Sequence, residues 1–163
     1  ADTILFSTRW TKKDINNLEK IIPGILNKQK KIYIISNQFN SNFYKKNIFT
    51  RYRQNFTIID EFLFKNKRIP NSEELIVLEK NYFKSYYFNK SNELKNNRLI
   101  KIADKFNIYY FDRNSLTCEP MIKRCMVLTP NNKKIFSDPD HYNEDGFNYL
   151  AKKLFSMGFL SNL

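Results

Sequence analysis

Hydrophobic and polar positions follow one another in blocks whose lengths suit strands and helices in turn. Residues 4–6 form a short apolar run typical of a buried strand, and residues 31–36 form a second one. Between these two runs, apolar residues recur at helical spacing and predict an amphipathic helix that ends near Lys28: Ile15, Leu18, Ile22, Ile25 and Leu26. Strand, helix and strand of these lengths predict a βαβ unit with a right-handed crossover.

The same order of strands and helices continues after a long stretch without a clear period. Residues 37–71 are rich in asparagine and aromatic residues, and we expect a long loop with short helical or extended pieces there. We expect helices from Ser72, from Ser91 and over residues 146–155, and a third strand over residues 108–111. In the last helix the residues expected to face inward are Phe147, Leu150, Ala151 and Leu154. The alternation predicts an α/β fold: an open parallel sheet in three layers, with helices on both faces.

The length of 163 residues suits one domain, and no linker divides the sequence, so we expect a single domain over residues 1–163. No run of about twenty apolar residues occurs, and we therefore expect no membrane-spanning segment. The chain opens almost directly on its first predicted strand. This opening leads us to expect that a further segment precedes Ala1.

The formal net charge is +12, an excess typical of proteins that bind nucleic acid, anionic lipid or an acidic glycan. The lysines are scattered rather than grouped, and Lys, Asn, Ile, Phe and Tyr are abundant together, as AT-rich coding would produce. Arginine and aromatic residues interleave over residues 44–53, a pattern that can stack bases, but so short a stretch is weak evidence. We expect no nucleic-acid partner. A non-catalytic basic module that binds an acidic glycan, or as a less favoured choice nucleic acid, stays open as an alternative.

Cys118 and Cys125 lie within one short stretch, and the only other soft metal ligand in the sequence is His141. A structural zinc site needs about four ligands, so we expect no metal site. The two cysteines fit a disulfide that closes a short loop, which would require an oxidising compartment. They also fit two free cysteines in the core.

The densest group of chemically capable residues is the stretch 137–141, Ser-Asp-Pro-Asp-His, which ends on the only histidine of the sequence. A carboxylate at Asp138, three residues before His141, can turn onto the imidazole. It would fix the ring's tautomer and stabilise the imidazolium when His141 takes a proton from a nucleophile. The alternative interpretation is a surface loop with an incidental histidine, in which Asn143 caps the following helix.

The stretch Phe136-Ser137-Asp138-Pro139-Asp140-His141-Tyr142-Asn143, followed by Gly146, resembles the last block of SGNH hydrolases. In that family Asp-x-x-His supplies the acid and base of a Ser-His-Asp triad. The resemblance is closest to the SGNH domain fused to, or partnered with, acyltransferase-3 membrane proteins, where the block reads Phe-Asp-Asp-Asp-His-Leu-Ser, two residues, then Gly. A cysteine pair upstream and an early strand ending in Ala-Arg-Trp also match, the latter at residues 4–10.

This resemblance implies an SGNH or flavodoxin-like fold, with His141 and Asp138 as catalytic residues and a disulfide between Cys118 and Cys125. The implied activity is transfer of an acyl group, such as acetyl, to cell-envelope polysaccharide or peptidoglycan, or hydrolysis of such an ester. The implied partners are an acyltransferase-3 membrane domain as acyl donor and a glycan as acceptor. No cofactor is implied, and the implied location is the periplasm or the outer face of the membrane.

The sequence departs from the family at the nucleophile. Its three glycines, Gly24, Gly146 and Gly158, begin no Gly-Asp-Ser motif, and no Gly-x-Asn occurs. We therefore expect the family's first strand and its serine to lie before Ala1, and the chain by itself to be inactive. Ser7 is the nearest serine by strand position but lacks the motif. A degenerate domain that only binds is the alternative.

Arg9 and Trp10 follow the first predicted strand, at the edge where open α/β sheets bind ligands. Arg9 could hold a developing oxyanion or an acidic glycan, and Trp10 could stack on a sugar ring. The alternative is that Trp10 belongs to the core and Arg9 is a solvated strand end.

Overall fold

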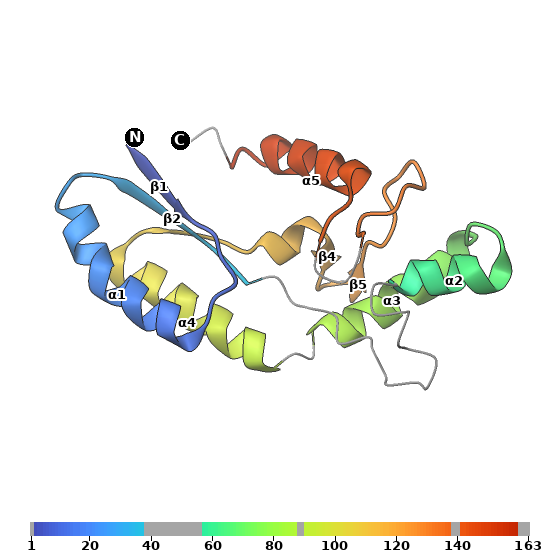
Figure 1. Ribbon diagram of the computed structural model, residues 1–163, viewed down its shortest axis with the longest axis horizontal. Helices are drawn as coiled ribbons and strands as arrows, with labels where there is room; N and C mark the ends of the chain where they lie inside the picture. Colours follow the sequence, from blue (N-terminus) through green and yellow to red (C-terminus); the bar gives the residue numbers. More distant parts are fainter. Residues whose placement is uncertain (1, 38–56, 88–89, 138–140, 160–163) are drawn as a thin grey trace. The chain divides into compact units, whose positions relative to one another are not determined.

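The computed structural model (Figure 1) describes most of the chain, namely residues 2–37, 57–87, 90–137 and 141–159. The described residues group into two compact units. Of the described residues, the first unit contains 2–37 and 90–114, and the second unit contains 57–87, 115–137 and 141–159. Each unit is described by itself below, and a single domain over the whole chain stays a prediction.

The first unit is built on a parallel sheet with the strand order β1, β2, β3. The strands are β1 (Thr3–Phe6), β2 (Lys31–Ile35) and β3 (Tyr109–Phe111). Tyr33 at the centre of β2 lies opposite Leu5 on one side and Tyr109 on the other, where the two tyrosine rings stack at 4.5 Å. All three strands lie within a residue of their predicted positions, and the α/β class is confirmed.

Two helices cover one face of this sheet: α1 (Lys12–Leu26) and α4 (Lys90–Phe106). Both pack against the side of β2 that carries Ile32 and Ile34. Their own buried residues recur at helical spacing: Ile15, Leu18 and Ile22 in α1, and Leu99, Ile102 and Ala103 in α4. A second helical layer on the opposite face stays a prediction.

The second unit contains helices α2 (Ile58–Asn66), α3 (Ser72–Tyr87) and α5 (Glu144–Ser156) and the short strands β4 (Cys118–Glu119) and β5 (Arg124–Cys125). These five elements include one helix that the sequence analysis did not predict, α2.

Helix α2 lies within residues 37–71, where we expected a long loop with short helical or extended pieces but did not place a helix; residues 38–56 of that stretch lie outside the described part of the chain. Thr57 begins the helix with a capping box, since its side chain accepts from the Asp60 backbone N–H and the Asp60 carboxylate accepts from the Thr57 backbone N–H at 2.8 Å. Asp60 also accepts from Lys134 Nζ at 2.6 Å. The Thr-x-x-Asp spacing was the sequence signal for this helix start, and the absence of a clear apolar period concealed it.

Helix α5 was predicted correctly in place, but its inward face differs from the expectation. Leu150 is buried, at 4% exposure, whereas Phe147 is 62% exposed and Ala151 is also exposed. The buried position at the start of the helix is Gly146. The helical spacing of apolar residues predicted the position of the helix. The close contact at its start is made by Gly146, which has no side chain and lies against the Ile135 backbone.

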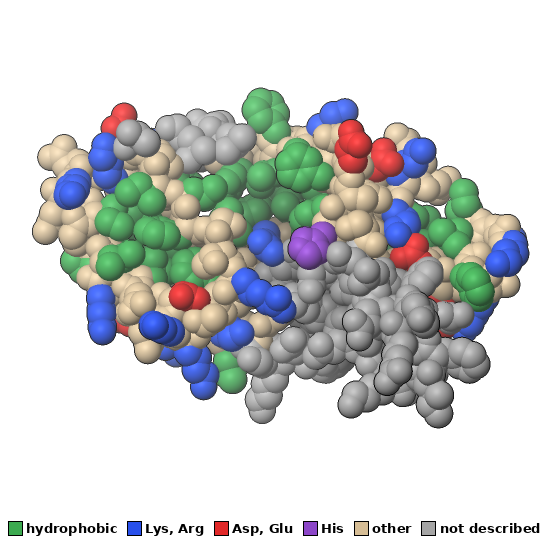
Figure 2. All heavy atoms as spheres, viewed as in Figure 1, with side chains coloured by type: hydrophobic (Ala, Val, Ile, Leu, Met, Phe, Trp, Pro, Cys, Tyr) green, Lys and Arg blue, Asp and Glu red, His purple; other side chains and the backbone are tan. Residues whose placement is uncertain are grey.

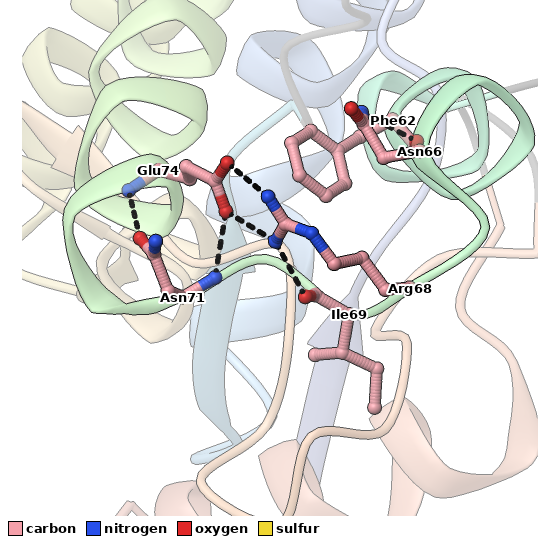
Figure 3. A network of polar contacts seen from close by, with 6 residues as sticks. All are labelled: Phe62, Asn66, Arg68, Ile69, Asn71 and Glu74. Atoms are coloured by element: carbon pink, nitrogen blue, oxygen red, sulfur yellow. Dashed lines mark hydrogen bonds and ion pairs between the residues drawn. The ribbon is translucent and has the colours of Figure 1, made fainter.

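Helix α3 begins with a network of polar contacts that also involves the preceding turn (Figure 3). Asn71 and Glu74 cap the helix reciprocally: each side chain accepts from the other residue's backbone N–H at 2.9 Å. The Arg68 guanidinium donates to both carboxylate oxygens of Glu74 at 2.6 Å and to the Ile69 carbonyl at 3.2 Å. The guanidinium also lies 5.6 Å from the centre of the Phe62 ring on α2. The network thus ties the connection between α2 and α3 to the first turn of α3.

The network predicts an unusual titration of Glu74. Hydrogen bonds from Arg68 and then from the Asn71 backbone lower the pKa of Glu74 from 4.5 to about 2. Because the folded pKa is below the unfolded one, the contribution to stability is complete above pH 4.5 and is lost as the pH falls toward 2. We expect the carboxyl carbon resonance of Glu74 to titrate near the lower value, and Arg68→Gln to move it back toward the ordinary one. Lys67→Gln, next in the chain, should leave it in place; a titration unchanged by Arg68→Gln would contradict the assignment.

Candidate functional site

His141 lies at the end of a loop whose two flanks are hydrogen-bonded to each other. The His141 carbonyl accepts from the backbone N–H of Ser137 at 2.9 Å and from the Ser137 hydroxyl at 3.1 Å. The next residues outward, Phe136 and Tyr142, form an antiparallel bridge, and their rings lie 5.1 Å apart. Residue 141 is exposed, and Figure 2 shows its imidazole at the surface (purple). The backbone of this histidine is therefore restrained while its ring is accessible.

The start of α5 restrains the chain on the other side of His141. Asn143 caps the helix, with its side-chain oxygen accepting from the Gly146 N–H at 2.7 Å, as the sequence predicted. The Asn143 backbone N–H donates to the Ile135 carbonyl at 3.0 Å. A Cβ atom on Gly146 would lie 2.1 Å from that same carbonyl oxygen, so the first helical turn rests directly on the Ile135 backbone. Only glycine permits this approach.

Asp138, the predicted orienting acid, lies outside the described residues, together with Pro139 and Asp140. Its pairing with His141 therefore stays a prediction. The two residues that flank residues 138–140 are hydrogen-bonded to each other, from Ser137 to the His141 carbonyl.

The cysteines of the second unit form the disulfide that the resemblance implies. Cys118 on β4 and Cys125 on β5 lie opposite each other in the two-stranded sheet, and their sulfur atoms are bonded at 2.01 Å. Both residues are buried. The pair closes a small hairpin, and the interpretation as two free core cysteines is wrong.

Two contacts connect this hairpin to the helices of the second unit. Arg124 on β5 forms an ion pair with Glu79, a residue of α3 that is only 6% exposed. Lys153 on α5 donates to the Leu116 carbonyl, just before β4, at 2.8 Å. A buried carboxylate is costly unless it is paired, so the Arg124–Glu79 contact compensates the burial of Glu79. The disulfide hairpin therefore connects α3 and α5 within one unit.

Arg9 and Trp10 lie in the first unit, directly after β1. Trp10 is 3% exposed and belongs to the core that α1 and α4 share. Its indole N–H donates to the Ile35 carbonyl at 2.7 Å. A buried ring cannot stack on a sugar, so the structure corrects that role for Trp10 and favours the core alternative. Arg9 is exposed, and a role in binding stays a prediction for this residue.

Sequence reasoning missed a buried polar cluster at the carboxyl ends of β2 and β3. Asn37 accepts from the Trp10 backbone N–H at 2.8 Å and donates back to the Trp10 carbonyl at 3.3 Å. The Asn37 backbone N–H donates to the Asn96 side chain at 2.8 Å, and the Asn114 side chain donates to the Asn37 carbonyl at 3.0 Å. Asn114 also donates to Asp112 at 2.6 Å. Because these groups satisfy one another, the cluster joins the strand ends and the segment after β1 into one rigid edge. An asparagine directly after a predicted strand was the available signal.

In the described ranges, no three His, Cys, Asp or Glu side chains gather closely enough to hold a metal ion. None of the helices that the structure describes is long and apolar enough to cross a bilayer.

No protein-family model and no curated protein matches the chain. A solved structure with a similar fold is the periplasmic domain of the lipopolysaccharide acetyltransferase of Salmonella ser. Paratyphi A, with a TM-score of 0.55 and 19% sequence identity. The match covers 95% of this chain and 55% of that one, so the chain spans about half the length of this structural neighbour. At this identity the likeness is one of fold.

The contact between Gly146 and Ile135 can be tested by adding one methyl group. We expect Gly146→Ala to destabilise the protein by about 1–3 kcal/mol, because the methyl group displaces the helix from the Ile135 carbonyl. Gly24→Ala is the matched control: its Cβ meets nothing within 4 Å, and alanine should stabilise helix α1 by up to about 1 kcal/mol. Urea unfolding measures both changes, and equal stability of the two variants would show that α5 does not need this close approach.

Proposed function

We propose that this chain is part of an extracytoplasmic acyltransferase or esterase domain that acts on cell-envelope polysaccharide or peptidoglycan. His141 is its general base and Asp138 its orienting acid. The observation that carries the proposal is that the backbone of His141 is restrained by two hydrogen bonds from Ser137 while residue 141 is exposed. General base catalysis requires a positioned and accessible imidazole, and we propose that Asp138 supplies the carboxylate that orients it.

The proposed chemistry proceeds through an acyl-enzyme. A serine hydroxyl attacks the acyl carbonyl, and its proton passes to Nε2 of His141. Asp138 accepts from the Nδ1–H and stabilises the imidazolium until the ring returns the proton to the leaving group. A glycan hydroxyl or water then attacks the acyl-enzyme, with His141 again taking and returning the proton. The serine is not within a Gly-Asp-Ser motif of this sequence, and we propose that it is supplied outside these 163 residues.

Three findings support this assignment. The structural neighbour is a periplasmic domain of an acetyltransferase that acts on lipopolysaccharide, and its chain is nearly twice as long as the matched region. The disulfide between Cys118 and Cys125 is typical of an oxidising compartment such as the periplasm. The parallel sheet with α1 and α4 is of the α/β class, and we propose that a further strand and a second helical layer complete it as an SGNH-like, three-layer fold. An acyltransferase-3 membrane domain is the proposed acyl donor, and serine chemistry of this kind needs no metal or organic cofactor.

The pairing of Asp138 with His141 can be read from the tautomer of the ring. We expect the neutral imidazole to carry its proton on Nδ1, because the carboxylate accepts from that atom. Asp138→Asn should shift the ring toward a mixture of tautomers. A long-range proton–nitrogen correlation spectrum at about pH 9, above the usual imidazole range, measures this without ambiguity, since the chain has one histidine.

Asp140→Asn is the matched control, because it removes an equal charge from the same loop and should leave the tautomer unchanged. If the two variants gave the same spectrum as the unchanged protein, Asp138 would not be the orienting acid.

The location of the nucleophile can be tested by activity. We expect the 163-residue chain to hydrolyse p-nitrophenyl acetate no faster than its His141→Ala variant, because the general base has no serine to activate. The assay compares initial rates at equal protein concentration. Turnover that His141→Ala abolishes would place the nucleophile within this chain and make Ser7 the first residue to replace.

A further inference from the structure

Helices α2 and α3 line a groove of about 630 Å³ in the second unit, in the usual size range of small-ligand sites. The α2 residues that line it lie on one helical stripe: Ile58, Glu61, Phe62, Lys65 and Asn66. The α3 residues that face them are Leu78, Asn81 and Lys84. In Figure 1 the two helices lie side by side, joined by a short turn. The groove is thus built from two regular elements.

The apolar part of the groove is formed by Ile58, Phe62 and Leu78. Ile58 is buried, and the other two are half-buried. Arg68 lies 5.6 Å from the centre of the Phe62 ring, and its ion pair with Glu74 holds it there. The ring is therefore restrained from the side of the helix connection.

The polar part of the groove combines carboxamides with one unneutralised charge. Asn66 and Asn81 each carry donors and an acceptor on the same side chain. Lys65 is neutralised by Glu61, since its Nζ lies 2.8 Å from the carboxylate. Lys84 forms no ion pair with any acidic residue that the structure describes, so the groove has an excess positive charge at that end.

We propose that this groove binds an acidic oligosaccharide, with a sugar ring on the Phe62 side and a carboxylate or phosphate at Lys84. A pyranose presents an apolar face of C–H groups and an edge of hydroxyls that both donate and accept, which matches one aromatic ring flanked by two carboxamides. The net positive charge of the rim selects an anionic sugar over a neutral one. The ligand class is derived from the groove alone; its role as the site of the acceptor glycan rests on the proposed function.

The test is a titration of the whole chain with a tetrasaccharide of galacturonic acid, followed by proton–nitrogen spectra. We expect shifts of the backbone amides of α2 and α3 that line the groove. Lys84→Gln should weaken binding about fivefold, the effect of one solvent-accessible ion pair. Lys80→Gln is the matched control: it lies one turn earlier on α3, is exposed and does not line the groove, and should bind as the unchanged protein does. Both variants change exposed residues, and unchanged spectra away from α3 verify their folding.

Three outcomes would overturn the proposal. The first is that maltotetraose, which is neutral, binds as tightly as the acidic tetrasaccharide. The second is that Lys80→Gln weakens binding as much as Lys84→Gln does, and the third is that the amides of α2 and α3 do not shift. Because the tautomer of His141 is measured without any sugar, failure of this groove and failure of the proposed catalytic role can be told apart.

Discussion

The contact between the first turn of α5 and the backbone of Ile135 is the constraint on which the candidate site depends. Gly146 has no Cβ, so the helix can rest on the Ile135 carbonyl, where any larger residue would overlap it. The same carbonyl accepts from Asn143, the residue that caps the helix. His141 is two residues before that cap, and backbone contacts on both sides of it restrain its position. An exposed imidazole on a restrained backbone suits the proposed role of taking and returning a proton.

Contacts of the disulfide hairpin connect α5 with other elements of the second unit. Cys118 and Cys125 join β4 to β5, the ion pair between Arg124 and the buried Glu79 joins β5 to α3, and Lys153 joins α5 to the segment before β4. The part of this unit that the structure describes contains three α-helices and a two-stranded sheet, and its apolar core is small. The disulfide stabilises such a unit because it restricts the conformational freedom of the unfolded chain. The hairpin thus links the helix that follows His141 with the helix that forms one wall of the groove.

The proposed catalytic base and the proposed binding groove lie in the same unit, as an enzyme that acts on a polymer would require. A polymer must be held at sugars away from the reacting hydroxyl, because a single sugar offers little binding energy. The first unit makes a different contribution: its cluster around Asn37 makes the carboxyl edge of the sheet rigid. In open α/β proteins this edge is where ligands bind, and Arg9 is exposed beside it.

The sequence by itself determined the α/β class, the three parallel strands and four of the five α-helices that the structure describes, and it selected the candidate site residues, whose roles stay a prediction. These are consequences of local patterns: apolar runs for β2, helical spacing for α1, and the rare residues His141, Cys118 and Cys125, whose chemistry few other side chains share. Only the tertiary structure decided that Trp10 is core, because an aromatic residue after a strand fits a binding site and a packed interior equally well until its neighbours are known. It also decided that Gly146 is the residue through which α5 contacts the Ile135 backbone, because glycine has no side chain and a pattern of hydrophobic positions does not include it. The groove is lined by both α2 and α3, so it could not be predicted without α2. Helix α2 has a capping box but no clear apolar period, and the formation of this helix therefore depends on packing against residues distant in the sequence.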